Sequence, residues 1–168
     1  MSERKTFYFD NNATTRVAPE VIEAMLPFLR DFWGNPSSAY SFGSQVAKRV
    51  EEARAKVAAL IGAEPREIVF TSCGTESNNA ALQSALATQP AKRHILTTSV
   101  EHPAILNHCE WLRKQSFEVT FLPVDADGVL DLHLLDQSIR PDTAVVSVMW
   151  ANNETGVVFP VDGGTTAQ

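Results

Sequence analysis

The chain has 168 residues, of which 44% are hydrophobic and 20% are charged, a globular composition that excludes a disordered tail, a collagen and a coiled coil. Fourteen basic and 20 acidic residues give a net charge of −6, which argues against nucleic acid and an anionic membrane as partners. The N-terminus carries no apolar signal segment, and the longest apolar stretch, residues 144–151, is too short to cross a bilayer. We therefore expect a cytoplasmic protein.

Helices and strands are expected to alternate along the chain. Apolar residues at helical spacing predict helices over 19–31 and 44–61, and Gly62 is a typical residue to end the second helix. The following elements are a short buried strand at 68–71, a helix at 75–87, a strand at 94–98, a helix at 103–115, a strand at 117–124, a helix at 130–139 and a strand at 144–149. This alternation predicts an α/β fold with a mostly parallel sheet and flanking helices.

Three of the predicted strands are followed by polar loops, at residues 71–79, 99–103 and 150–156. Ligands of open α/β sheets bind outside the carboxyl ends of the strands. We therefore expect these three loops to cluster on one edge of the sheet and to form a site.

The first of these loops leads into a helix through Gly74 and Thr75. A helix N-terminus presents unpaired N–H groups and attracts phosphate, and the Thr75 hydroxyl adds another donor. A plain helix cap is the alternative, and the spacing alone favours it. The preceding thiol, Cys73, has no basic neighbour in the sequence, so a buried thiol is expected rather than a nucleophile.

His102 in the second loop directly precedes a predicted helix. Its ring could stack on a flat ligand or transfer protons near neutral pH, or it could simply cap the helix. A metal site with His108 and Cys109 matches no zinc spacing, so no metal is expected. His94 and His133 are expected at a strand edge and on the surface.

The third loop carries Asn152 and Asn153, whose amides could bond a ligand hydroxyl or form a tight turn. Asn11 and Asn12 lie in a similarly polar stretch near the N-terminus. Either stretch has the composition of a turn as well as that of a binding loop.

Five segments together carry a family resemblance, and they are residues 9–15, 34–38, 71–77, 101–103 and 152–156. In order and spacing, over residues 7 to about 161, the chain resembles the cysteine desulfurases, and among them the nitrogen-fixation type. These are pyridoxal 5′-phosphate enzymes of the class V aminotransferase group. The resemblance implies part of the large domain of a fold type I transferase.

The resemblance also implies roles for residues. Gly74 and Thr75 would hold the cofactor phosphate, while His102 would stack on the cofactor ring as a catalytic residue that also moves protons. Asn153 would lie near the phenolic oxygen of the cofactor, and Asn11 and Asn12 near the substrate. The implied reaction converts L-cysteine to L-alanine and passes sulfur to an iron–sulfur scaffold protein, in a homodimer.

The chain departs from the family in length and in its lysines. Family members are more than twice as long, and their Schiff-base lysine follows a histidine, whereas no lysine here does. We interpret residues 1–18 as an N-terminal segment near the active site, 19–161 as the first part of the large domain and 162–168 as the tail of a truncation product. Little activity is expected of this chain alone. The alternatives are a selenocysteine lyase, another class V aminotransferase or a non-catalytic remnant.

Overall fold

The computed structural model describes residues 7–161, and these divide into two compact units, one up to Phe70 and one from Thr71 onward. Each unit is described by itself. The predicted boundaries at residues 18 and 161 stay predictions, and the predicted tail, residues 162–168, lies outside the described part.

The first unit contains helix α1 (Pro19–Arg30), helix α2 (Ser41–Ile61) and the short 3-10 helix η1 (Pro65–Glu67). Proline at the first position suits α1 because it lacks an N–H that would have no partner there. Gly62 ends α2 at φ 70°, as predicted, and its N–H bonds to the carbonyl of Ala58. Both predicted helices are confirmed, and α2 begins three residues earlier than expected.

The loop before α2 lies directly against its first turn. A Cβ on Gly43 would come within 2.4 Å of the carbonyl oxygen of Asn35, so only glycine fits there without movement. Elsewhere this unit buries little: among its described residues, 7–70, Ala58 is the one buried hydrophobic side chain. The helices of the first unit are therefore supported by only a small apolar core.

The strand predicted at residues 68–71 is wrong. These residues pair with no described strand, and the side chains of Val69 and Phe70 are 78% and 48% exposed. Instead, the Arg54 guanidinium donates to the carbonyl of Ile68 and lies 4.9 Å from the centre of the Phe70 ring. A short apolar run forms a strand only where a neighbouring strand completes its hydrogen bonds.

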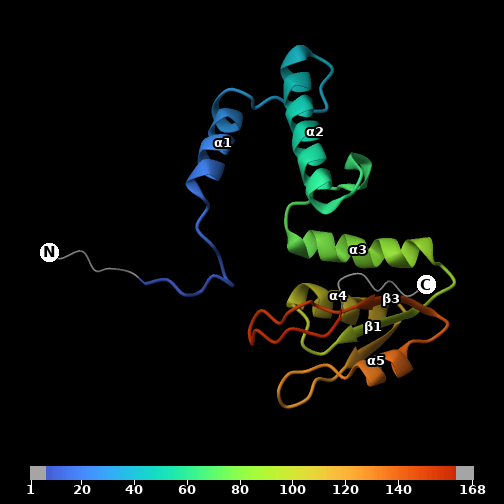
Figure 1. Ribbon diagram of the computed structural model, residues 1–168. Helices are drawn as coiled ribbons and strands as arrows, with labels where there is room; N and C mark the ends of the chain where they lie inside the picture. Colours follow the sequence, from blue (N-terminus) through green and yellow to red (C-terminus); the bar gives the residue numbers. More distant parts are fainter. Residues whose placement is uncertain (1–6, 162–168) are drawn as a thin grey trace. The chain divides into compact units, whose positions relative to one another are not determined.

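The second unit is a parallel sheet covered by helices on both faces (Figure 1). Strands β1 (His94–Thr98), β2 (Glu118–Leu122) and β3 (Thr143–Ser147) lie in the order β2-β1-β3. Helix α3 (Gly74–Thr88) precedes the sheet, α4 (Pro103–Lys114) links β1 to β2, and α5 (Leu132–Ser138) links β2 to β3. The predicted α/β fold with a parallel sheet is confirmed for this part of the chain.

The neighbours Ile95 and Leu96 in β1 are both 0% exposed because consecutive strand residues point to opposite faces and both faces are covered. The cluster around Ile95 contains Leu82 and Leu86 of α3 and Ile105, Cys109 and Leu112 of α4. The cluster around Leu96 contains Leu122, Leu130 and Phe159, with Leu134 and Leu135 of α5 against it. This two-sided core holds the carboxyl end of β1, where the polar loops follow.

His94 begins the central strand β1 and is 0% exposed, so the expectation of a strand-edge residue is wrong. Its ring nitrogens lie 2.7 Å from the Thr143 hydroxyl of β3 and 2.9 Å from the Thr120 hydroxyl of β2. One imidazole therefore joins all three strands. His133 is on the surface, as predicted.

Candidate functional site

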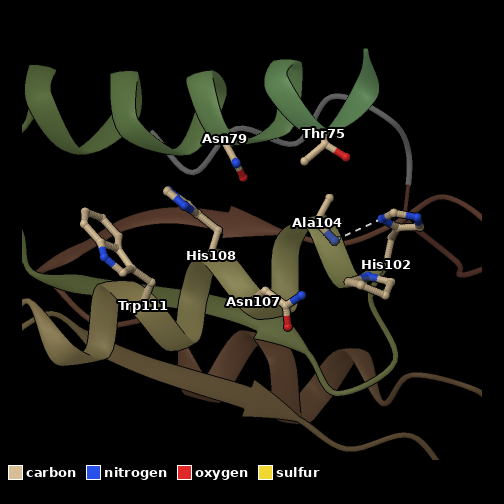
Figure 2. Close-up of a pocket in the computed structure, with 8 residues that line it drawn as sticks. Thr75, Asn79, His102, Ala104, Asn107, His108 and Trp111 are labelled. Atoms are coloured by element: carbon tan, nitrogen blue, oxygen red, sulfur yellow. Dashed lines mark hydrogen bonds between the residues drawn. The ribbon is translucent and has the colours of Figure 1, made fainter.

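A pocket of about 400 Å³ lies between α3 and α4, where the first two polar loops enter their helices. Figure 2 shows Thr75 and Asn79 of α3 across from the side chains of α4. The residues lining it are Thr75, Asn79, His102, Pro103, Ala104, Asn107, His108 and Trp111. The structure thus brings together Thr75 and His102, which the sequence analysis selected separately.

Gly74 is the first residue of α3, and no protein atom requires it to be glycine. A Cβ built there meets nothing within 4 Å, and its backbone is not in the left-handed region that favours glycine. The beginning of α3 therefore offers open backbone beside the Thr75 hydroxyl. Any requirement for glycine at this position would come from a molecule approaching the helix end.

The loop before α3 is tied down by Glu76. One carboxylate oxygen of Glu76 accepts from both the backbone N–H and the hydroxyl of Ser72, each at 2.6 Å. These hydrogen bonds lower the pKa of Glu76 below its ordinary value, with the Ser72 hydroxyl as the largest cause. Thr71 and Ser77 join their hydroxyls at 2.6 Å across the same turn. The approach to the helix end is therefore held by side chains of the same loop.

His102 is the N-cap of α4, and its Nδ1 accepts from the Ala104 backbone N–H at 3.0 Å (Figure 2). Since Nδ1 accepts, the neutral ring carries its proton on Nε2. The predicted capping role is confirmed, and the ring also lines the pocket. The capping hydrogen bond orients the ring through Nδ1, so Nε2 is the ring nitrogen that a ligand in the pocket could contact.

The second and third loops meet beside this pocket. The Glu101 carboxylate accepts from the Met149 backbone N–H at 2.6 Å, and the Asn152 side-chain amide donates to the carbonyl of Val100 at 3.2 Å. The Asn152 carbonyl oxygen accepts from the N–H groups of Glu154 and Thr155, both at 2.9 Å. Asn152 therefore builds the turn, one of the two roles considered for this loop.

Asn153 follows on this turn, and its side chain donates to the Glu154 carboxylate at 2.8 Å. It is not among the residues that line the pocket between α3 and α4. Its predicted role near a cofactor oxygen stays a prediction. Of the three predicted loops, the middle one shares a pocket with the first and hydrogen bonds with the third.

Four pocket residues with polar or aromatic side chains were not assigned to this site by the sequence analysis: Asn79, Asn107, His108 and Trp111. Helical spacing could have found one of them, since Asn79 is four residues after the selected Thr75. The His108 and Trp111 rings stack with centres 5.5 Å apart, and partial burial lowers the pKa of His108. Within residues 7–161, the buried Oδ1 of Asn79 has no hydrogen-bond partner.

The expectation of a buried thiol at Cys73 is wrong. Cys73 is exposed at the N-cap of α3, and its pKa is lowered by the backbone N–H of Glu76 and by the Ser72 hydroxyl. Cys109 is the buried thiol, and burial raises its pKa to about 11. The sequence showed no basic neighbour for Cys73, but helix-end N–H groups act in the same direction as a positive charge.

Asn11 and Asn12 belong to the first unit and lie in an exposed turn. The Asp10 carbonyl accepts from Ala13 N–H at 3.2 Å, and the Asn11 carbonyl accepts from the Thr15 hydroxyl at 3.3 Å. The turn alternative is therefore confirmed for this stretch. The predicted place of both asparagines near a substrate stays a prediction.

Two kinds of feature are absent from the part of the chain that the structure describes. Residues 7–161 contain no group of three or more His, Cys, Asp or Glu side chains placed to hold a metal ion. Within the same range, none of the helices has the length and hydropathy needed to cross a bilayer.

Comparison with known proteins gives a consistent family match. The model of the class-V aminotransferase family matches residues 7–166. Cysteine desulfurase 2 of Trichormus variabilis is 61% identical over 155 residues, and the cysteine desulfurase NifS of Azotobacter vinelandii is 53% identical over 156 residues. Each alignment covers 92% of this chain and 39% of the relative, so the chain spans well under half the length of these relatives.

Solved structures agree with the sequence match. A NifS-like protein superposes with a TM-score of 0.86 at 46% identity, covering 91% of this chain and 42% of that protein. A structure described as SspA in complex with cysteine gives 0.85 at 38% identity, with coverage of 92% and 45%. The α/β arrangement therefore matches part of a known fold, and the predicted fold class is confirmed.

Proposed function

The chain belongs to the class-V aminotransferase family, and from that premise we propose that its second unit binds pyridoxal 5′-phosphate as part of a cysteine desulfurase. The observation that carries the proposal is the single pocket lined by both Thr75 and His102. The first lies at a helix N-terminus suited to a phosphate and the second presents a fixed aromatic ring. A phosphorylated aromatic molecule needs both features at one site.

The residues present fit two parts of this cofactor, its phosphate and its ring. Open space at Gly74 lets a phosphate approach the backbone of α3, and the Thr75 hydroxyl can donate to it. His102 can stack on the ring, with its Nε2–H available to donate a hydrogen bond, and Asn153 is proposed to face the phenolic oxygen. When bound, pyridoxal phosphate supplies an electron sink, while the protein supplies orientation and hydrogen bonds.

The proposed substrate is L-cysteine, which would be converted to L-alanine with sulfur passed to an iron–sulfur scaffold protein by a cytoplasmic homodimer. The relatives named cysteine desulfurases and the structural neighbour in complex with cysteine support this choice over a selenocysteine lyase or another class V aminotransferase. Asn11 and Asn12 are proposed to lie near the substrate. That the 168-residue chain alone has little activity stays a prediction, tested by measuring alanine formed from L-cysteine.

The binding proposal is tested with pyridoxamine 5′-phosphate, a probe that carries the same phosphate and ring and needs no lysine. Calorimetry on the wild-type chain is compared with Thr75→Val and Gly74→Ala. Loss of a hydrogen bond to a charged phosphate is worth ~1.5–3 kcal/mol, so Thr75→Val should weaken binding by about 10-fold or more.

Gly74→Ala should weaken binding while leaving the free energy of unfolding at or above that of wild type, because nothing in the free protein contacts the new methyl. His133→Ala, an exposed histidine of α5, is the matched control and should bind as wild type does. Absence of binding by the wild-type chain, or equal binding by all variants, would contradict the proposal.

A further inference from the structure

Glu101 is a buried carboxylate between the two loops that carry His102 and Asn153. The residue is 7% exposed, and its Oε1 accepts from Met149 N–H at 2.6 Å and from the Thr98 hydroxyl at 3.3 Å. A buried carboxylate is costly unless its hydrogen bonds repay the lost water. The sequence analysis quoted Glu101 within a motif but gave it no role.

The place of this carboxylate follows from how the sheet ends. Pairing between β1 and β3 stops at Thr97 and Ser147, while β1 continues beside β2 through Thr98 and Leu122. Ser99 N–H then bonds to the Leu122 carbonyl at 2.8 Å, so the chain leaves β3 and stays with β2. Glu101 Oε1 accepts from Met149 N–H just beyond the point where the pairing of β1 with β3 ends.

A second bond crosses between the same loops in the opposite sense. The Asn152 side chain donates to the Val100 carbonyl at 3.2 Å, while its own carbonyl oxygen holds the turn at residues 154 and 155. Each loop therefore contributes one side chain that forms a hydrogen bond with the backbone on the other side. His102 directly follows Glu101, and Asn153 directly follows Asn152.

We propose that Glu101 is a positioning residue, whose carboxylate oxygen fixes the backbone at Met149 and so sets the Asn153 turn relative to the His102 ring. This inference rests on the proposed function, because it assigns Glu101 to the placement of two residues of the cofactor site. What matters is a hydrogen-bond acceptor at the position of Oε1. We expect the position of this acceptor to matter more than its charge, because a neutral amide oxygen can accept from the same backbone N–H.

Three substitutions of Glu101 test whether the position of the acceptor oxygen or the negative charge is required. Glu101→Gln keeps an oxygen at the end of a side chain of equal length, Glu101→Asp keeps the charge on a side chain one methylene shorter, and Glu101→Ala removes both. With pyridoxamine 5′-phosphate as probe, the Ala and Asp variants should bind about 10-fold more weakly than wild type, a loss of ~1.4 kcal/mol, because the bond that places the Asn153 turn is gone. The Gln variant should bind within about threefold of wild type.

Leu130→Ala is the control for a general loss of stability. Leu130 is 2% exposed in the core on the α5 side, and its truncation should lower the free energy of unfolding by about 2–5 kcal/mol without changing probe affinity in the folded protein. If Leu130→Ala weakens the probe as much as Glu101→Ala does, the effect of Glu101 is general destabilisation, and the inference is overturned.

A second readout needs no ligand. Amide hydrogen exchange at Met149, Glu154 and Thr155 should be faster in Glu101→Ala and Glu101→Asp than in wild type, and unchanged in Glu101→Gln. If the wild-type chain does not bind the probe, the proposed function is contradicted. The exchange rates then still test whether Glu101 holds the backbone at Met149. If Glu101→Ala does not fold, the comparison of Glu101→Gln with Glu101→Asp tests the inference. Wild-type affinity and exchange rates in Glu101→Asp but not in Glu101→Gln would overturn it.

Discussion

The imidazole of His102 has two separate tasks that use different atoms. Nδ1 accepts from Ala104 and begins α4, while the ring and Nε2 border the pocket. A phenylalanine at this position could stack but could not cap, and an asparagine could cap but offers no aromatic face. The proposed function therefore requires at this position a side chain that is both a hydrogen-bond acceptor near its own backbone and a flat ring.

The two thiols should differ sharply in alkylation. Cys73 is exposed with a lowered pKa, whereas burial raises the pKa of Cys109 to about 11, and the thiolate is the reactive form. At pH 7.5, iodoacetamide followed by mass spectrometry should label Cys73 in the folded protein and Cys109 only after unfolding in urea.

Ser72→Ala should slow labelling of Cys73 several-fold, because the Ser72 hydroxyl is one of the groups that lower its pKa. Ser138→Ala, whose hydroxyl bonds to the Leu134 carbonyl in α5, is the control and should leave the rate unchanged. Equal labelling of both thiols in the folded protein would contradict the assignment.

The strands of the sheet are joined at their beginning by His94. Its ring bonds to hydroxyls of Thr120 and Thr143 and is surrounded by the charged side chains of Glu118, Arg140 and Asp142. Desolvation by burial and the charge of Arg140 lower the pKa of His94, and this outweighs the opposite influence of the two carboxylates. The folded sheet therefore favours the neutral form of this ring.

The sheet should consequently lose stability in mild acid. A histidine whose folded pKa lies below its unfolded value of ~6.5 contributes stability that is present above that pH and is lost as the pH falls toward the folded pKa. The free energy of unfolding in urea should decrease from pH 7.5 to 5.5, and His94→Gln should reduce this slope while costing about 1–3 kcal/mol at pH 7.5. His133→Gln should keep the wild-type slope. A slope in His94→Gln equal to that of wild type would refute this role.

Predicting this fold from sequence succeeded where local signals were sufficient. The helices and the strands at 94–98, 117–124 and 144–149 have strong periodicity or continuous apolar runs and are confirmed within a few residues. Residues 68–71 have the same local signal but pair with no described strand, and pairing depends on residues distant in sequence. For the same reason the motifs indicated Thr75 and His102 but not Glu101, whose partner Met149 is 48 residues away.

The two units of the chain differ in how much they bury. Within residues 71–161 two apolar clusters cover both faces of a sheet, whereas within residues 7–70 Ala58 is the one buried hydrophobic side chain. Large side chains of the first unit are exposed, among them Phe9 at 87%, Leu60 at 84% and Trp33 at 70%. Local stability follows buried apolar contacts, so the units should open separately.

Limited proteolysis should therefore cut the first unit before the second. We expect early cleavage between residues 31 and 73 and a resistant fragment that begins near Thr71, identified by mass spectrometry. Phe159→Ala should make that fragment sensitive, because Phe159 is 1% exposed and its truncation costs about 3–5 kcal/mol. Trp150→Ala, at a side chain 60% exposed, should not. Early cleavage within residues 94–147 of the wild-type chain would contradict this difference.

The division at Phe70 also sets the order of events during synthesis. Ribosomes add roughly 5–20 residues per second, so the 98 residues from Thr71 to Gln168 need roughly 5–20 s after residue 70 has been joined. During that interval α1 and α2 emerge with their exposed apolar side chains, while neither apolar cluster of the second unit has formed. These clusters contain no residue of the first unit. The first unit therefore presents these apolar side chains to solvent throughout this interval, and exposed apolar surface on a nascent chain favours aggregation.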